Sequence, residues 1–166
     1  MNNKYLLSAV AIAIAAVSMY SIFLSDADRT GQLDVVFYNV ENLFDIENDP
    51  NTFDDEFTPD SAKNWTQERY DKKLKDLAKV LTAIAEDGHP EAFGLCEIEN
   101  RKVVEDLVKT DSLAARKYVV VHEESPDKRG IDVAFVYDSE VLSELYHEKI
   151  RYSFSFEPET TTRDIL

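Results

Sequence analysis

The stretch that decides the fold is Gly94-Leu-Cys-Glu-Ile-Glu-Asn100. The apolar and small residues from Ala92 to Cys96 predict a buried strand that ends at Glu97. Glu99 and Asn100 then resemble the start of a helix. A carboxylate at the end of a buried strand is poorly placed for packing and well placed to bind a metal ion. The alternative is a strand that ends in solvent-facing acids, since Glu is usually exposed.

The composition fits one acidic globular domain. The chain has 166 residues, of which 44% are hydrophobic, so it can build a core. Its formal net charge of −15 argues against a general polyanion binder that works by charge alone. A phosphate or nucleic acid substrate fits that charge if a divalent cation mediates the contact. The single cysteine, Cys96, lies between apolar strand residues, which predicts a buried and unreactive thiol.

The N-terminal residues have the pattern of an export signal. An uncharged run over residues 5–24 follows Lys4, and charged residues return at Asp26. We therefore expect residues 1–27 to be a signal peptide or an N-terminal membrane anchor. Cleavage is slightly favoured, because Ser25-Asp26-Ala27 is a passable cleavage site, and retention stays open. In both cases the body is exported, to the periplasm or the extracellular space, and only this segment would contact a membrane.

The next elements predict a strand, a helix and a strand. Leu33 to Val40 is a nearly continuous apolar run with Asn39 near its end, and an apolar stripe at helical spacing predicts a helix from Asp60 or Ser61 to about Glu86. This order predicts a parallel pair of strands, so Asn39 and Glu97 would reach the sheet edge where ligands bind in α/β folds. The alternative for Asn39 is that its side chain ties down the following loop.

An acidic loop is expected over Asp45 to Asp60. Its acids partly match the spacing of a calcium-binding loop, but Pro50 stands where such a loop needs glycine. A solvated loop near a substrate cleft is therefore the favoured interpretation. The elements expected after it are a helix over 100–115, a hairpin of 118–121 with 130–137, a helical turn over 139–145 and a strand over 148–156.

Asp132 is an acid inside an otherwise apolar strand and needs a partner. Arg129, Lys128 or a polar cluster at the cleft could supply one. A structural ion pair and a role in the site are both open for it.

Four stretches carry a family resemblance when taken together. They are Val36-Phe-Tyr-Asn-Val-Glu-Asn-Leu-Phe-Asp45, Gly94 to Asn100, Arg129-Gly-Ile-Asp-Val-Ala-Phe-Val-Tyr137 and Thr162-Arg-Asp-Ile-Leu166. In this order and spacing they resemble the endonuclease/exonuclease/phosphatase superfamily, over residues 33–166. The resemblance implies the N-terminal half of a deoxyribonuclease I-like α/β/β/α sandwich. For this chain the expected α/β fold is one mixed β-sheet with helices packed on one face.

The resemblance also implies cleavage of phosphoester bonds with Mg²⁺, or with Mn²⁺ or Ca²⁺. Glu97 would be the acidic metal ligand, and Asn39 would stand beside the metal and the scissile phosphate. Arg163 matches a basic residue that can contact phosphate. Asp132, a further candidate catalytic residue, and Arg129 match the family pattern without a defined role. The substrate would be a phosphoester, with nucleic acid, inositol phosphates and lipids all open.

One part of the family pattern is missing. Its second half carries an Asp–His pair that activates water, in Gly-Asp-x-Asn-like and Ser-Asp-His-like stretches, and His89, His122 and His147 stand in other contexts. We therefore expect a domain that is incomplete at its C-terminus and inactive alone, with no protein partner indicated beyond the second half. One bare apolar sheet face would favour association or instability. The alternative function is a non-catalytic exported module that binds a cation or a partner through an acidic cleft.

Overall fold

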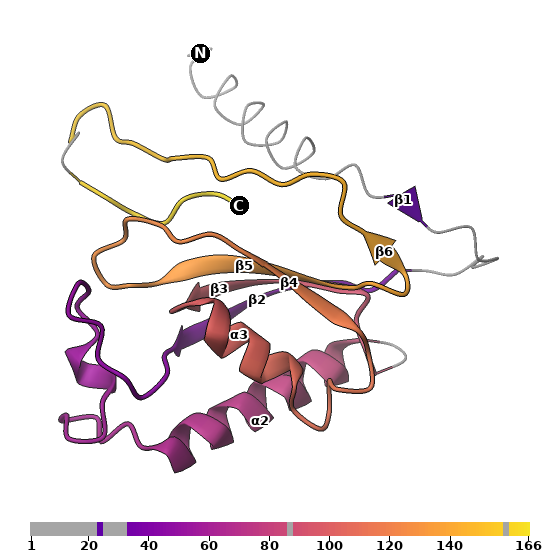
Figure 1. The fold of residues 1–166 in the computed structure, drawn as a ribbon, viewed down its shortest axis with the longest axis horizontal. Helices are drawn as coiled ribbons and strands as arrows, with labels where there is room; N and C mark the ends of the chain where they lie inside the picture. Colours follow the sequence, from indigo (N-terminus) through magenta and orange to yellow (C-terminus); the bar gives the residue numbers. More distant parts are fainter. Residues whose placement is uncertain (1–22, 25–32, 86–87, 158–159) are drawn as a thin grey trace, which may run out of the picture.

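The computed structural model describes residues 23–24, 33–85, 88–157 and 160–166, so nearly all of the expected leader, residues 1–27, lies outside the described residues. A mixed four-stranded sheet carries helices on one face, as predicted (Figure 1). In spatial order its strands are β2 (Val35–Leu43), β3 (Ala92–Ile98), β5 (Asp132–Asp138) and β4 (Tyr118–His122). A separate pair joins β1 (Phe23–Leu24) to β6 (Leu142–Ser143). No helix among the described residues is long and apolar enough to span a membrane.

The strand directions bring four strand ends together. Strand β2 is parallel to β3, and the expected hairpin of β4 with β5 is present, with β5 antiparallel to both of its neighbours. The carboxyl ends of β2, β3 and β4 therefore meet the amino end of β5 at one edge. Asn39 pairs in register with Cys96, directly before Glu97, which confirms that Asn39 and Glu97 reach the same edge.

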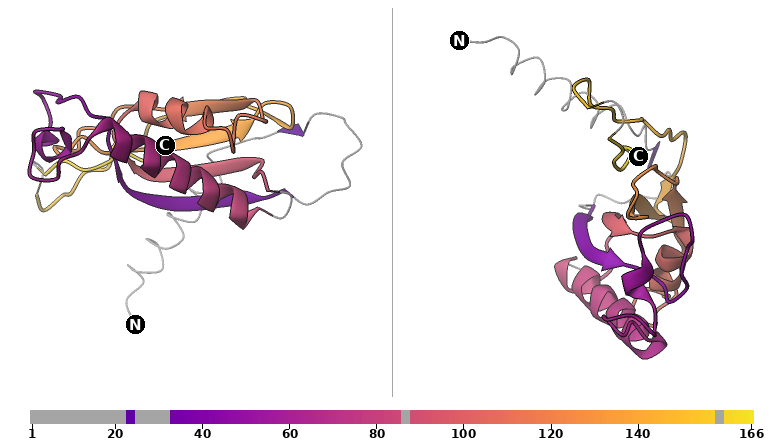
Figure 2. Two further views of the ribbon diagram at one scale, coloured as in Figure 1. Left: turned by 90° about the horizontal axis from the view of Figure 1, so that it is seen from below. Right: turned by 90° about the vertical axis from the view of Figure 1, so that its left-hand side faces the viewer.

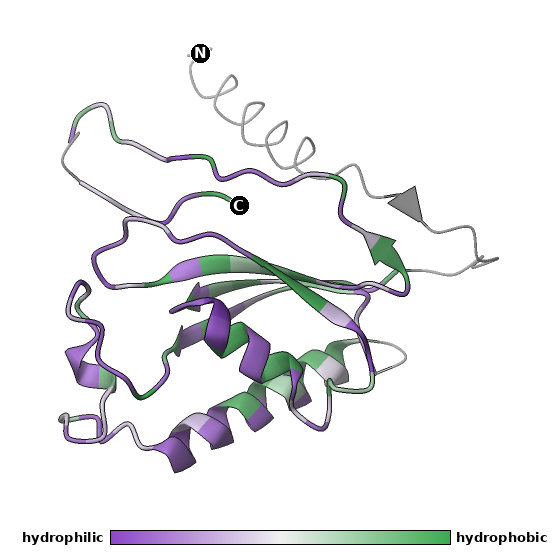
Figure 3. Cartoon of the chain, viewed as in Figure 1, coloured by the Kyte–Doolittle hydropathy of each residue, from purple (hydrophilic) through white to green (hydrophobic). Residues whose placement is uncertain are grey.

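Helix α2 (Gln67–Ile84) and helix α3 (Arg101–Val108) form the layer below the sheet (Figures 1 and 2). Apolar and polar residues are interleaved along both helices (Figure 3), and the buried ones are the apolar residues together with Tyr70. Burying a large aliphatic side chain stabilises the fold by about 1.5–3 kcal/mol, so this packing fixes the sheet. The core between the layers includes Tyr70, Leu74, Leu77 and Leu81 of α2 with Phe93, Leu95 and Val136 of the sheet.

Helix α2 begins later than the sequence predicted. Residues 61–64 form turns, in which the hydroxyl of Ser61 donates to the carbonyl oxygen of Thr58 at 2.8 Å. Trp65 is buried, and its Nε1 donates to the carbonyl oxygen of Phe44 at 3.0 Å. Because Trp65 is held by the core at this point, the backbone reaches helical geometry only at Gln67. The short 3-10 helix η1 (Asp55–Phe57) precedes these turns.

Helix α3 is shorter than predicted. Asn100 caps its start, with Oδ1 accepting from the backbone nitrogen of Val103 at 3.1 Å. The helix ends at Val108 rather than near residue 115, because the carbonyl oxygen of Leu107 accepts from both the backbone nitrogen and the hydroxyl of Thr110. These bonds replace the next helical turn, and residues 109–115 form turns.

The C-terminal residues differ most from the prediction. The expected helical turn over 139–145 instead contains strand β6, and the expected strand over 148–156 makes only two isolated bridges. Residues 144–157 and 160–166 run along the side of the sheet opposite the helices (Figure 1). The predicted bare face is therefore partly occupied, although Val35 and Phe37 remain 50% and 78% exposed. The ring of Phe37 lies over Gly94, where an added Cβ would come within 2.6 Å of it.

Candidate functional site

A double bulge interrupts the β2–β3 pair near its carboxyl end. The register is regular as far as Asn39 opposite Cys96 and resumes at Leu43 opposite Ile98. Three residues of β2 therefore lie opposite a single residue of β3, which is Glu97. Bulges redirect side chains and are common beside active sites. The strand end that the sequence singled out is thus irregular on both strands.

The bulge holds three non-glycine residues in the left-handed region. Their φ angles are 53° at Glu41, 65° at Asn42 and 67° at Glu97. Each such residue costs on the order of 1–3 kcal/mol and persists only when its surroundings fix it. Asn39 provides part of that fixation, since its Oδ1 accepts from the backbone nitrogen of Glu41 at 2.8 Å. Lys73 of α2 provides more, with Nζ donating to the carbonyl oxygens of Glu41 and Asn42 at 2.6 and 3.1 Å.

Asn39 therefore does what the alternative interpretation expected, because its side chain ties down the turn that follows. This does not remove it from the site, since the turn it fixes is the one that presents Glu41. The side chain of Asn39 is exposed at the edge. Asn39 can thus position the neighbouring acid and still face a ligand.

Glu97 and Glu41 share one electrostatic environment. Burial lowers the pKa of the Lys73 ammonium, and the charges of Glu41 and Glu97 oppose that shift. Arg163 approaches from the C-terminal segment, with Nη1 3.9 Å from Oε1 of Glu97. The structure thus brings Asn39, Glu97 and Arg163 to one place, which we call the edge cluster together with Glu41.

Glu41 is the residue that sequence reasoning missed. It stands two positions after Asn39 in Asn39-Val40-Glu41, so strand alternation alone would put both side chains on one face. That signal was available in the sequence. The left-handed backbone at Glu41, Asn42 and Glu97, which forms the bulge, could not be read from it.

Cys96 is half-buried rather than fully buried, because it faces the side of the sheet opposite the helices. Burial raises the pKa of its thiol, and the charge of Arg163 only partly offsets this. A raised thiol pKa disfavours the reactive thiolate.

Asp132 lies on the helix-facing side of β5, together with Ala134 and Val136, and is buried. Its Oδ2 is 3.2 Å from Nε2 of His122, and its Oδ1 accepts from the backbone nitrogen of Ser125 at 2.9 Å and from the Ser125 hydroxyl. The partners of Asp132 are therefore polar residues, His122 and Ser125, and not the expected alternatives Arg129 or Lys128. No hydrogen bond or ion pair among the described residues joins Asp132 to the edge cluster, although it pairs in register with Ile98, the residue after Glu97. His122, to which the sequence assigned no role, pairs with Asp132.

Arg129 does not pair with Asp132 but with Asp127. Two side-chain hydrogen bonds join them, Nε to Oδ1 at 3.0 Å and Nη2 to Oδ2 at 2.8 Å. Burial alone would raise the pKa of Asp127, but the hydrogen bonds and charge of Arg129 lower it. The charges of Arg163 and Glu97 also act on this pair, so Arg129 lies near the edge cluster.

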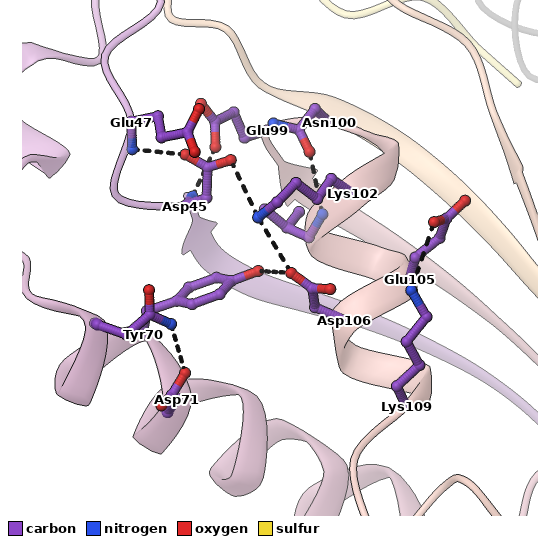
Figure 4. Close-up of polar contacts among 12 residues, drawn as sticks. Asp45, Glu47, Tyr70, Asp71, Glu99, Asn100, Lys102, Glu105, Asp106 and Lys109 are labelled. Carbon is purple, nitrogen blue, oxygen red and sulfur yellow. Dashed lines mark hydrogen bonds and ion pairs between the residues drawn. The ribbon is translucent and has the colours of Figure 1, made fainter.

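The acidic loop is exposed over most of its length, as expected, and it is anchored to the fold at Asp45. Glu99 Oε2 accepts from the backbone nitrogen of Asp45 at 2.7 Å, and Lys102 Nζ lies 3.6 Å from Asp45 Oδ2 (Figure 4). The hydroxyl of Tyr70 donates to Asp106 at 3.0 Å. Burial raises the pKa of Glu99 to about 8. We call these five residues the loop-anchoring network, and its carboxylates are occupied by the fold.

Comparison with known proteins supplies the family. A family profile described as Endonuclease/Exonuclease/phosphatase family matches residues 34–166. No curated protein and no solved structure matched the chain. Proteins of that family generally use a divalent metal ion, and membership indicates phosphoester hydrolase activity. With its mixed sheet and the acids at its edge, this chain belongs to the endonuclease/exonuclease/phosphatase family.

Proposed function

We propose that this chain carries the metal-binding part of a phosphoester hydrolase that depends on a divalent cation. The observation that supports the proposal is the double bulge at the end of β2 and β3, where the charges of Glu41 and Glu97 both act on Lys73. Mg²⁺ prefers oxygen ligands and keeps several waters, so one or two carboxylates plus a substrate phosphate suffice. Mn²⁺ and Ca²⁺ accept the same kind of ligand.

Each residue of the edge cluster has a role in this proposal. Glu97 and Glu41 bind the cation, and Asn39 fixes the turn that carries Glu41 while facing the scissile phosphate. Arg163 orients the phosphate from the other side of Glu97. The bound cation would supply neutralisation of the charge that develops on the phosphoryl oxygens and the leaving group.

This arrangement would allow a protein with a net charge of −15 to bind an anionic phosphate in spite of electrostatic repulsion. A phosphate reaching the edge would meet a cation and the guanidinium groups of Arg163 and Arg129 before it met the acidic surface. Nucleic acids, inositol phosphates and phospholipids all present such a phosphate. The proposed site of action is outside the cytoplasm, with residues 1–27 directing export.

The competing function, a non-catalytic module with an acidic cleft, has less support. The acidic loop would have to form that cleft. Asp45 and Asp54 are buried and accept backbone hydrogen bonds from Glu47 and Asp49, so such a cleft would have to use the exposed acids of the loop. The family profile, by contrast, supports a phosphoester hydrolase.

Calorimetric titration of Mn²⁺ and Mg²⁺ into the chain tests the proposal. Glu97→Gln should weaken binding at least tenfold. Glu68→Gln, which removes an exposed acid from the first turn of α2, should leave binding unchanged. Equal affinities for the wild type and Glu97→Gln would overturn the proposal.

A further inference from the structure

A second group of potential metal ligands lies outside the edge cluster. His122 ends β4, Asp132 begins β5, and Glu124 lies in the turn between them. One ligand atom from each lies within 4.8 Å of the other two. The side chains of His122 and Asp132 are each only 3% exposed, whereas Glu124 reaches solvent. The buried His122 and Asp132 are thus held in place by the core, and an ion could reach them from solvent on the side of the exposed Glu124.

The spacing of the buried pair suits a shared ion. Two ligand atoms, each about 2.1 Å from one ion at tetrahedral or octahedral angles, lie roughly 3.0–3.4 Å apart. Nε2 of His122 and Oδ2 of Asp132 are 3.2 Å apart. Ser125 holds the other oxygen of Asp132 through its backbone nitrogen and its hydroxyl. Hydrogen bonds to the second oxygen of a carboxylate are what fixes such a ligand in known metal sites.

The third ligand comes from Glu124, which offers a carboxylate oxygen within 4.8 Å of the ligand atoms of both His122 and Asp132. Two carboxylates and one imidazole at this spacing form a donor set that a divalent cation can share. A cation bound by His122, Glu124 and Asp132 would offset the charge of both acids.

We propose that His122, Glu124 and Asp132 bind a first-row transition-metal dication, with Zn²⁺ as the representative ion, at a site distinct from the edge cluster. Imidazole combined with carboxylates suits Zn²⁺, whereas Mg²⁺ and Ca²⁺ prefer oxygen ligands alone. The ion clamps the turn between β4 and β5. That turn carries the Asp127–Arg129 pair, so the clamp positions Arg129 near Glu97. The inference rests on this geometry and not on the proposed hydrolase function.

The test is a calorimetric titration of Zn²⁺ into the chain in excess Mg²⁺, which occupies oxygen-only sites. The wild type should bind one Zn²⁺, and Glu124→Gln should weaken binding at least tenfold. Glu97→Gln should leave Zn²⁺ affinity unchanged, which separates this inference from the proposed function. Zn²⁺ should also raise the melting temperature of the wild type and not that of Glu124→Gln.

The matched control is His147→Gln. His147 is another histidine beside acids, pairing with Glu144 and Glu123 near the surface, and it must not be needed for Zn²⁺ binding. Three results would overturn the inference: no Zn²⁺ binding in excess Mg²⁺, equal affinity in Glu124→Gln, or loss of binding in His147→Gln. Because Glu124 is exposed, its substitution tests the site even if changing His122 prevents folding.

Discussion

Glu97 and Glu99 are two residues apart in the chain and have opposite surroundings. Glu97 sits in the left-handed region, is half-exposed, and has the guanidinium of Arg163 3.9 Å away. Glu99 is buried and accepts a short hydrogen bond from the backbone of Asp45. The two acids of this stretch therefore differ in use: the fold uses the carboxylate of Glu99, whereas that of Glu97 sits on strained backbone with a long contact to Arg163 and is the one that we propose as a metal ligand.

The largest effect should come from removing the acid that the fold uses. Glu99→Ala leaves the backbone nitrogen of Asp45 without its acceptor and opens a cavity, which should lower the free energy of unfolding by roughly 2–3 kcal/mol. Urea unfolding measures this. Cation affinity of the folded variant should stay near that of the wild type. A stable Glu99→Ala protein that had lost its cation would reverse the roles assigned to the two acids.

Glu97→Gly should have the opposite effect on stability. Glycine adopts a φ of 67° without strain, so the variant should gain about 1 kcal/mol in free energy of unfolding while losing cation binding. Glu97→Ala serves as the control, since it removes the carboxylate and keeps the strain. A gain in stability for alanine equal to that for glycine would show that strain is not what holds Glu97 in place.

Lys73→Met should loosen the bulge by a smaller amount. The ammonium group bonds two carbonyl oxygens of the bulge, and its loss should cost about 0.5–1.5 kcal/mol and speed hydrogen exchange at Glu41. Lys79→Met, at an exposed position on the same helix, should change neither quantity. Unchanged exchange in Lys73→Met would mean that Asn39 fixes the turn without help.

The smallest expected effect is a pH dependence of stability that comes from His147, away from Glu97 and Glu99. Hydrogen bonding to Glu144 raises the pKa of His147, and Glu123 adds to the shift. The protonated form is therefore favoured by folding. Its contribution is complete below the unfolded pKa of about 6.5 and is lost as pH rises through the higher folded value. The melting temperature of the wild type should exceed that of His147→Gln at pH 5.5, and the gap should close by pH 9. A constant gap would contradict this.

The sheet and its helices follow from local patterns. Apolar runs marked the strands from Val35 and Ala92, and the stripe through Leu74 and Leu81 marked α2. The order strand, helix, strand was enough to put Asn39 and Glu97 at one edge. The strand predicted over residues 148–156 is wrong: their alternation suits a strand, but among the described residues they form one bridge to another segment, from Ile150 to Ile165.

The details of the site depend on contacts that no local pattern encodes. The double bulge depends on how two strands fall out of register, so the sequence pattern did not predict that Glu41 lies within it. The pairing of His122 with Asp132 could nearly be predicted from the sequence. The hairpin was predicted, and its register puts His122 opposite Ala134, two residues from Asp132. What the sequence did not predict is the course of the loop that brings Ser125 to the carboxylate of Asp132.

The central claim is that the double bulge holds the divalent cation. Line broadening of backbone amide signals by substoichiometric Mn²⁺, recorded by nuclear magnetic resonance, locates the ion directly. The signals of residues 39–43 and 96–98 should broaden first, and Glu97→Gln should abolish the effect. Broadening centred on residues 45–58, and unchanged in Glu97→Gln, would place the cation on the acidic loop and contradict the claim.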